Sequence, residues 1–235
     1  AAAQSDTLDP SFGAGGLVVT DVAGSTDGAR ALAVQPDGKV LVAGRAFTGS
    51  TFDFALARYE TDGSLDPSFG SGGLVTTDFA GTEDQAFGLV ILSDGRIVVA
   101  GGAASGPTSD FALARYGPDG ALDPSFGDGG RVTTDFMGGF DQGHAVTLQP
   151  DGRLVVGGWA TAGSRDFGLA RYEADGALDL SFGDAGLVTT DFFGATDWIQ
   201  AVTVQPDGKI VAAGGANAAT PEFALARYTA EGALD

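Results

Sequence analysis

Short apolar runs separated by Gly, Asp and Pro recur along the chain and predict β-strands joined by tight turns. Residues 65–121 show the pattern once in full. β-Branched and aromatic residues bounded by Gly and Asp are typical of strands, and an Asp-Gly turn directly between two such runs predicts a hairpin. In this stretch the predicted strands are residues 74–79, 88–91, 97–101 and 111–116. No run indicates a helix, so each unit is expected to be a meander of four strands.

The same unit occurs four times. Its Asp-Gly turns contain Asp37, Asp94, Asp151 and Asp207, at spacings of 57, 57 and 56 residues. Self-similarity at a fixed period is the mark of a repeat architecture. The repeats begin near residues 8, 65, 122 and 178. We therefore predict a single domain over residues 8–235, preceded by a short N-terminal extension, residues 1–7.

A lone four-stranded sheet with two apolar faces must be covered by neighbouring sheets, and stacking such sheets around an axis gives a β-propeller. About 57 residues for four strands suit a propeller blade better than the shorter coil of a solenoid. The predicted fold is therefore an all-β propeller of four four-stranded antiparallel blades. Residues 18–20 are expected to pair beside residues 223–228, which would close the ring and cover two sheet edges. The alternatives are a piece of a longer propeller and a larger ring shared by two chains.

Charge and composition narrow the classes of partner. The net charge of −19 argues against binding to nucleic acid or to an anionic membrane. Of the 31 carboxylates, 24 fall in six columns that recur in every repeat, so the acid belongs first to the repeated turns. There is no cysteine to form disulfides or thiolate metal sites, and there is no apolar run long enough to span a membrane.

The N-terminus is small and polar, and it resembles what is left after a signal peptide has been cleaved. This feature predicts a secreted protein, extracellular or on the cell surface.

The columns that vary between repeats are the candidates for ligand binding, because the invariant columns serve a shape that every blade needs. One variable column ahead of the inner strand reads Gly28, Gln85, Gln142 and Trp198, and a second reads Arg30, Phe87, His144 and Gln200. Exposed aromatic rings beside polar groups suit a sugar or a peptide segment. The candidate ligand-binding residues are Trp198, Trp159, Phe52, His144, Arg30, Phe87, Arg45 and Arg165. The alternative is that these loops merely drift in sequence and that Trp159 or Trp198 fills the ring axis.

The repeated acids on the same face suggest a second kind of site. Calcium takes six to eight oxygen ligands, which carboxylates and backbone carbonyls can supply together. The candidate metal ligands are Asp21, Asp27, Asp78, Asp84, Asp135, Asp141, Asp191 and Asp197, with Asp110 and its counterparts nearby. No D-x-D-x-D-G loop is present, and Asp beside Gly more often caps turns. We therefore expect no cofactor, with calcium as the alternative.

A charged column runs through an otherwise apolar strand at Arg58, Arg115, Arg171 and Arg227. A buried charge needs a partner, and the nearest recurring carboxylates are those of the Asp-Gly and Leu-Asp turns. We predict a structural ion pair repeated in each blade.

The elements LDPSFG, VTTDF, QPDGK, VVAG and DFALARY, present across nearly the whole chain, resemble the delta-60 repeat family of bacterial proteins. The resemblance implies an exported β-propeller without an assigned activity. Departures are Leu180 and Ser93, each in place of a Pro, and Glu222 in place of an Asp. The order of strand, Asp-Gly turn and strand also resembles NHL propellers, which implies that residues 31–34 and their counterparts form the innermost strands.

Motifs of known catalytic sites are lacking, and His144 is the single histidine. We predict a non-catalytic binding or scaffold module that recognises a glycan or a peptide. A structural unit of a surface assembly or longer array, with self-association, is the first alternative. A hydrolase with a carboxylate site on the variable face is the second.

Overall fold

The computed structural model describes residues 8–79, 83–161, 163–217 and 220–235, and these form fifteen β-strands. The predicted extension, residues 1–7, lies outside the described residues. The strands are β1 (Asp27–Val34), β2 (Val40–Phe47), β3 (Phe52–Tyr59), β4 (Leu74–Thr77), β5 (Asp84–Ile91), β6 (Ile97–Ser105), β7 (Thr108–Tyr116), β8 (Arg131–Thr134), β9 (Gln142–Leu148), β10 (Leu154–Thr161), β11 (Arg165–Tyr172), β12 (Leu187–Thr190), β13 (Asp197–Val204), β14 (Ile210–Asn217) and β15 (Pro221–Tyr228). No helix that could cross a membrane occurs in this part of the chain.

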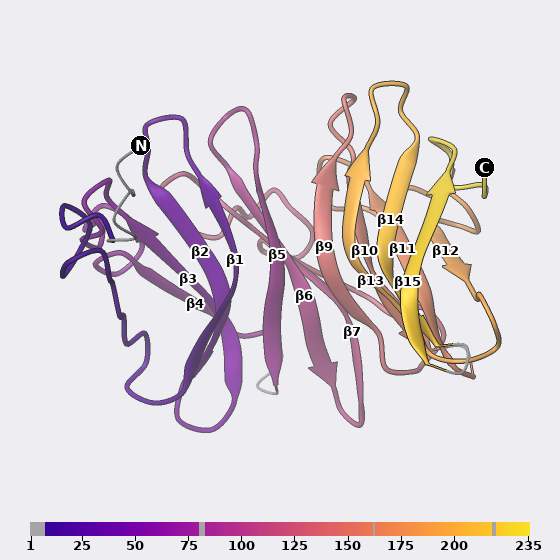
Figure 1. Cartoon of the computed structure of the whole chain (residues 1–235), viewed down its shortest axis with the longest axis horizontal. Helices are drawn as coiled ribbons and strands as arrows, with labels where there is room; N and C mark the ends of the chain where they lie inside the picture. Colours follow the sequence, from indigo (N-terminus) through magenta and orange to yellow (C-terminus); the bar gives the residue numbers. More distant parts are fainter. Residues whose placement is uncertain (1–7, 80–82, 162, 218–219) are drawn as a thin grey trace, which may run out of the picture.

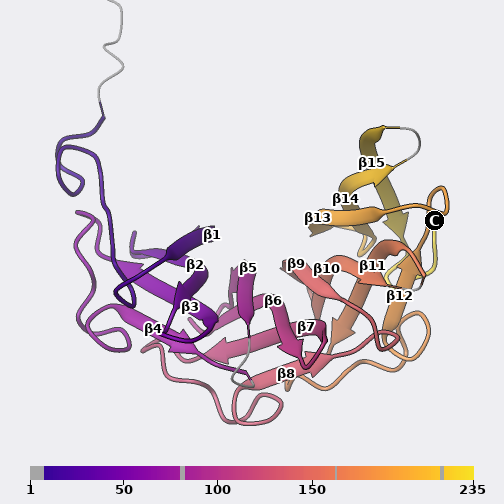
Figure 2. The same cartoon turned by 90° about the horizontal axis from the view of Figure 1, so that it is seen from below.

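The strands make antiparallel meanders in chain order. The first three sheets have four strands each, β1 to β4, β5 to β8 and β9 to β12, and the fourth has three, β13 to β15. The predicted all-β, propeller-like architecture is confirmed. The four sheets stand side by side in an arc, and the first strand of each sheet lines its concave side (Figures 1 and 2). These inner strands are β1, β5, β9 and β13.

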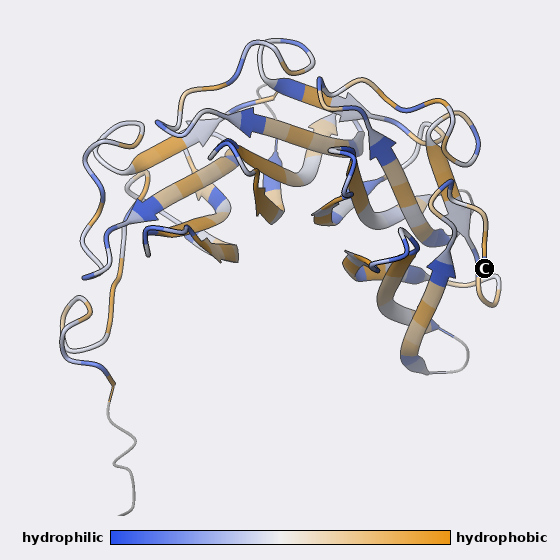
Figure 3. Ribbon diagram, turned by 90° about the horizontal axis from the view of Figure 1, so that it is seen from above, coloured by the Kyte–Doolittle hydropathy of each residue, from blue (hydrophilic) through white to orange (hydrophobic). Residues whose placement is uncertain are grey.

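The core lies between the sheets. Each of its three clusters combines side chains from two neighbouring sheets, such as Phe54 and Ile97 in the first cluster and Phe111 and Leu154 in the second. Figure 3 shows the apolar residues distributed along the strands of every sheet. Because both faces of a blade are apolar, a sheet standing alone would expose this apolar surface to water. Neighbouring sheets therefore stabilise each other.

A tyrosine at the end of each third strand joins neighbouring sheets. Tyr116 is fully buried, and its hydroxyl donates a hydrogen bond of 2.8 Å to Thr77 Oγ1 in the preceding sheet. The same bond links Tyr172 to Thr134 and Tyr228 to Thr190, at 2.9 Å each. The repeated threonine of the outer strand thus accepts a hydrogen bond from the next blade rather than from its own.

The predicted closure of the ring is not present in the structure. β15 is the last strand of its sheet, and residues 17–20 form no strand. The N-terminal segment instead lies against the first sheet, where Tyr59 donates a hydrogen bond of 2.8 Å to Thr20. Figures 2 and 3 show the four sheets in an arc that does not close. The first and fourth sheets therefore end the arc as two open faces.

Candidate functional site

Each inner strand contains a β-bulge at the same place. In β1, Ala29 pairs with Gly44 and Ala31 with Ala43, so Arg30 has no partner in the ladder. The extra residue of a bulge leaves the pleat and its side chain is re-aimed. Corresponding bulges occur in β5, β9 and β13. The bulged residues are Arg30, Phe87, His144 and Gln200, the variable column found in the sequence.

Repeated glycines make the bulges fit. A Cβ atom on Gly101 would lie only 2.0 Å from the backbone oxygen of Gln85, and one on Gly44 would lie 1.9 Å from that of Gly28. Such approaches are far below van der Waals contact. The glycine of the VAG run is therefore required, because a backbone carbonyl of the bulged inner strand occupies the place of a Cβ atom.

The four bulged residues form a continuous line across the concave side of the arc, which we call the inner row. The Arg30 guanidinium lies 5.7 Å from the centre of the Phe87 ring, and the rings of Phe87 and His144 are 4.8 Å apart. His144 Nε2 shares a hydrogen bond of 3.1 Å with Gln142 Oε1, and the Gln200 side chain lies close enough to His144 to affect its pKa. Four separate repeats thus contribute to one surface.

The electrostatics of the inner row favour a neutral imidazole. Burial lowers the pKa of His144, and the charges of Arg30 and Arg165 lower it further against the effect of the hydrogen bond from Gln200. At neutral pH the row therefore presents one cation, an aromatic ring, an imidazole and an amide. Its groups can stack on an apolar ring face and exchange hydrogen bonds with hydroxyls.

The other ligand-binding candidates are not bulged residues, although Trp198 lines the same cavity as Gln200 and Arg165 is close enough to His144 to lower its pKa. Arg45 covers Phe52 with a ring distance of 4.2 Å, and Arg165 covers Trp159 at 4.1 Å. Both pairs stand at the loop ends of hairpins, β2–β3 and β10–β11, so the arginines occupy ring faces that a ligand would need. Trp198 lies over Gly215 on the fourth sheet. Since the arc is open, neither tryptophan fills an axis.

The repeated acids gather in three clusters between neighbouring sheets. Asp53, at the start of β3, meets Asp78 and Asp84, with carboxylate oxygens within 4.8 Å of one another. The second cluster is Asp110, Asp135 and Asp141, and the third is Asp166, Asp191 and Asp197. Asp21 and Asp27 belong to no such cluster among the described residues. The signal for Asp53 and Asp166 was present in the sequence as the repeated acid before each Phe of the third strand.

Hydrogen bonds show that these carboxylates cap turns. Asp84 Oδ2 accepts a bond of 2.8 Å from the Phe79 amide, and Asp141 accepts bonds of 2.9 and 2.8 Å from the amides of Phe136 and Thr161. Burial raises the pKa of Asp84 to about 6, and the charges of Asp78 and Asp53 contribute. The hydrogen bonds match the turn-capping interpretation, while three carboxylates in one place also suit a Ca²⁺ ion.

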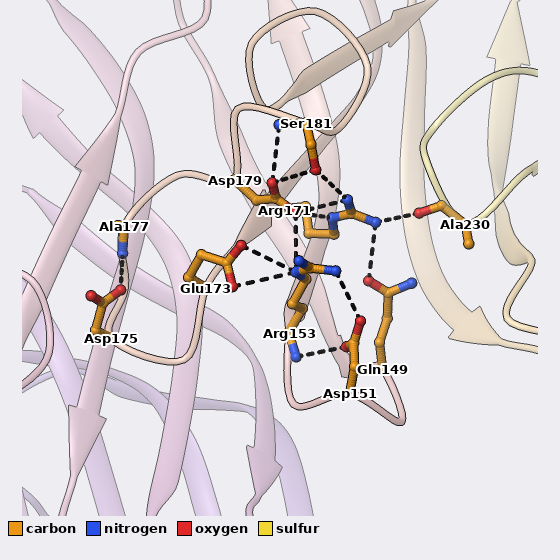
Figure 4. A network of polar contacts seen from close by, with 10 residues as sticks. All are labelled: Gln149, Asp151, Arg153, Arg171, Glu173, Asp175, Ala177, Asp179, Ser181 and Ala230. Atoms are coloured by element: carbon orange, nitrogen blue, oxygen red, sulfur yellow. Dashed lines mark hydrogen bonds and ion pairs between the residues drawn. The ribbon is translucent and has the colours of Figure 1, made fainter.

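The arginine column forms ion pairs on the opposite end of the sheets, as Figure 4 shows for the third one. Arg171 Nε donates a hydrogen bond of 2.7 Å to Asp179, and its Nη1 donates to the Ala230 carbonyl of the next sheet. Its guanidinium also lies 4.6 Å from the Phe182 ring centre. Counterpart ion pairs join Arg58 to Asp66, Arg115 to Asp123 and Arg227 to Asp235. Three of these arginines therefore also fasten one sheet to the next.

Four repeated antiparallel sheets around a common concave side define a protein of the β-propeller class. A family model described as a domain of unknown function (DUF5122) beta-propeller matches residues 35–69, 92–126, 149–182 and 205–235. The matches include more than half of the chain, one in each repeat. The protein belongs to this DUF5122 β-propeller family. Among curated proteins, none matches the chain.

Two solved structures share the fold at low sequence identity. A protein of unknown function from Dyadobacter fermentans has a TM-score of 0.54 and 12% identity, with 85% of this chain and 60% of that chain covered. A gluconolactonase from Xanthomonas campestris has a TM-score of 0.51 and 17% identity, with 88% and 60% covered. The chain thus spans about three fifths of the length of both. Identities this low show the fold alone.

Proposed function

We propose that the protein is a non-catalytic, extracellular binding module that takes a carbohydrate along the inner row. The observation that carries this proposal is the bulge in each inner strand, which brings the residues that differ between repeats into one contiguous line. A structural column has no need to differ from blade to blade, whereas a surface that fits one asymmetric ligand does.

The chemistry of the row suits a sugar. The Phe87 ring offers an apolar surface for the CH groups of a pyranose. Arg30 and Gln200 are exposed, and His144 is half-buried. Their polar atoms can exchange hydrogen bonds with hydroxyl groups, and the buried Nδ1 of His144 has no hydrogen-bond partner. A row that crosses four sheets offers room for several sugar units in succession.

A glycan array followed by calorimetry tests the proposal. We expect the protein to bind one class of oligosaccharide, and Phe87→Ala to weaken that binding by about tenfold or more, because an aromatic contact contributes about 0.5–1.5 kcal/mol beyond the area it buries. His144→Ala is expected to weaken binding similarly. Phe193→Ala is the control, because Phe193 is an exposed phenylalanine that lies outside the row.

Two outcomes would contradict the proposal. One is the absence of carbohydrate binding across the array, and the other is binding that survives both inner-row substitutions unchanged. Binding of a peptide in place of a sugar would assign the same row to the alternative ligand class. Turnover of a bound sugar that is lost in Asp84→Asn would instead support the hydrolase alternative.

The proposed location outside the cell rests on the sequence features described above. So does the resemblance to delta-60 repeats, which implies an exported protein, and so does the resemblance to NHL repeats, which implies only that residues 31–34 and their counterparts are innermost. Detection of the native protein outside the cell by fractionation would support this part of the proposal.

A further inference from the structure

The ion-pair end of the second sheet differs from the same end of the first and third sheets. Three residues around its two arginines change together, and two of these changes remove a side chain that accepts hydrogen bonds. The replacements, with their counterparts in the first and third repeats, are Leu92 for Gln35 and Gln149, Ser93 for Pro36 and Pro150, and Gly117 for Glu60 and Glu173.

The first change leaves the arginine of the hairpin turn without a glutamate. In the third sheet, Arg153 Nε lies 3.2 Å from Glu173 Oε1 (Figure 4). The second sheet has Gly117 at the place of this glutamate. Its turn arginine, Arg96, keeps the ion pair with Asp94 of the same turn, at 2.6 Å. The second sheet thus has one carboxylate fewer around the same two cations.

The second change removes an acceptor from the buried arginine of the sheet. Gln149 is buried in the third sheet, and its Oε1 accepts a hydrogen bond of 3.4 Å from Arg171 Nη1 (Figure 4). The corresponding pair in the second sheet is Leu92 and Arg115. Since a leucine has no acceptor, Arg115 lacks the bond that its counterpart makes.

Arg115 keeps hydrogen-bonding capacity that the protein does not use. It donates from Nε to Asp123, from Nη1 to the Ala174 carbonyl and from Nη2 to Ser125. A guanidinium has five N–H donors, so two are without an acceptor in the part of the chain that the structure describes. Arg115 is only 3% exposed, and a buried charged donor without an acceptor is costly. Burial lowers the pKa of Arg115, and the charge of Arg96 lowers it further.

These groups line a cavity of about 150 Å³ between the second and third sheets. Both sheets lie inside the arc, with a further sheet on each side (Figure 2). Arg96, Arg115 and Ser93 contribute to the polar part of the lining. The apolar part is formed by three leucines, Leu92, Leu148 and Leu154. The cavity therefore combines two guanidinium groups with an apolar wall.

We propose that this cavity binds a small carboxylate with a short apolar tail. The carboxylate gives Arg96 the partner that Gly117 does not supply, and it gives Arg115 the acceptor that Leu92 does not supply. A carboxylate can accept two parallel N–H bonds from one guanidinium, while the tail removes apolar surface of the leucines from water. The site is separate from the inner row and does not depend on the proposed carbohydrate binding.

An NMR titration with 3-methylbutanoate tests the site, because the tail of this carboxylate is a leucine side chain. We expect saturable shifts of the methyl signals of Leu92, Leu148 and Leu154, with a dissociation constant of about 1 mM. An ionic strength of about 0.15 M screens the remote charges of this acidic protein. The matched control is 3-methylbutanamide, which is expected to bind at least about tenfold more weakly because it lacks the charge-assisted hydrogen bonds.

Gly117→Glu gives an independent readout, because it restores the glutamate of the first and third repeats. The nearest atom to the added Cβ is Asp119 Oδ1, at 2.8 Å, which belongs to a side chain that can shift. The new carboxylate competes for Arg96, so binding of 3-methylbutanoate is expected to weaken by about tenfold or more. Gly117→Thr is the matched control, since the fourth repeat has Thr229 here, and it should bind like the unmodified protein.

Leu92→Gln is the second variant, with the residue that the other three repeats carry. It gives Arg115 an internal acceptor and is likewise expected to weaken binding, which keeps the test decisive if Gly117→Glu does not fold.

The proposal is overturned if the leucine signals do not saturate by about 20 mM 3-methylbutanoate. It is equally overturned if the acid and its amide bind alike, or if folded Gly117→Glu and Leu92→Gln variants bind as the unmodified protein does. Inorganic phosphate is titrated in parallel. Tighter binding of phosphate than of 3-methylbutanoate would contradict the assignment of an apolar tail.

Discussion

At the scale of single residues, the repeated charged side chains form ion pairs at one end of the sheets and carboxylate clusters at the other. At one end each arginine of the column meets an aspartate, and the three buried arginines also reach the next sheet. At the other end three carboxylates come together in each of three clusters. The ion pairs could be predicted from sequence, because a charge in an apolar strand demands a partner. The clusters could be predicted only in part, because their members come from neighbouring sheets.

These carboxylates predict how stability depends on pH. Burial raises the pKa of Asp84 to about 6 and also raises the pKa of Asp110, Asp141 and Asp166. The folded state therefore binds more protons than the unfolded chain between about pH 4 and 6, so stability falls as the pH rises through this range. We expect the melting temperature to be a few degrees higher at about pH 5 than at about pH 7.5.

The buried histidine acts in the opposite direction, because burial lowers its pKa and protonation below about pH 6.5 costs stability. The melting temperatures at pH 5 and pH 7.5 are therefore compared by calorimetry in the His144→Gln variant, in which the histidine no longer contributes. Below about pH 4 stability should fall again, as Asp66 and Asp123, whose pKa values are lowered by hydrogen bonds from Lys39 and Ser125, become protonated. A melting temperature that rises steadily from pH 5 to 7.5 would contradict this account.

At the scale of elements, the decisive feature is the bulge in each inner strand. The sequence predicted the strands, the Asp-Gly turns and the variable column, because each follows from local residue patterns. It did not predict the bulges, since no local turn chemistry marks an extra residue in a strand. The glycine that recurs in the VAG run can be seen in the sequence. The need for it cannot, because that need comes from a backbone carbonyl on the neighbouring strand that leaves no room for a Cβ atom. The sequence spacing likewise does not predict that arginines cover the rings of Phe52 and Trp159, because these contacts form across a hairpin.

Substitution of the glycine opposite a bulge tests this explanation. Gly101→Ala should destabilise the protein by about 1–3 kcal/mol, because its Cβ would meet the backbone oxygen of Gln85 and the Phe54 ring. Gly28→Ala is the control, since nothing lies within 4 Å of its added Cβ, and it should change stability by about 0.5 kcal/mol or less. Equal effects in urea denaturation would show that the bulge does not constrain this position.

At the scale of the whole molecule, the repeats build an open arc rather than the closed ring expected from four blades. The number of sheets, their strand order and their side-by-side packing follow from the repeat itself. The angle between sheets does not, because it depends on how side chains such as Phe54 and Tyr116 fill the space between two sheets. An open arc leaves a concave side accessible, which is the basis of the proposed function.

The central claim is that the bulges of separate repeats gather the variable residues into one row. Nuclear Overhauser effects between the ring protons of Phe87 and His144 measure this most directly, because the two residues are far apart in the chain and their rings are 4.8 Å apart. The structure predicts strong cross-peaks between the rings. The absence of these cross-peaks would contradict the inner row, provided that the cross-peaks between strands are those expected of the four sheets.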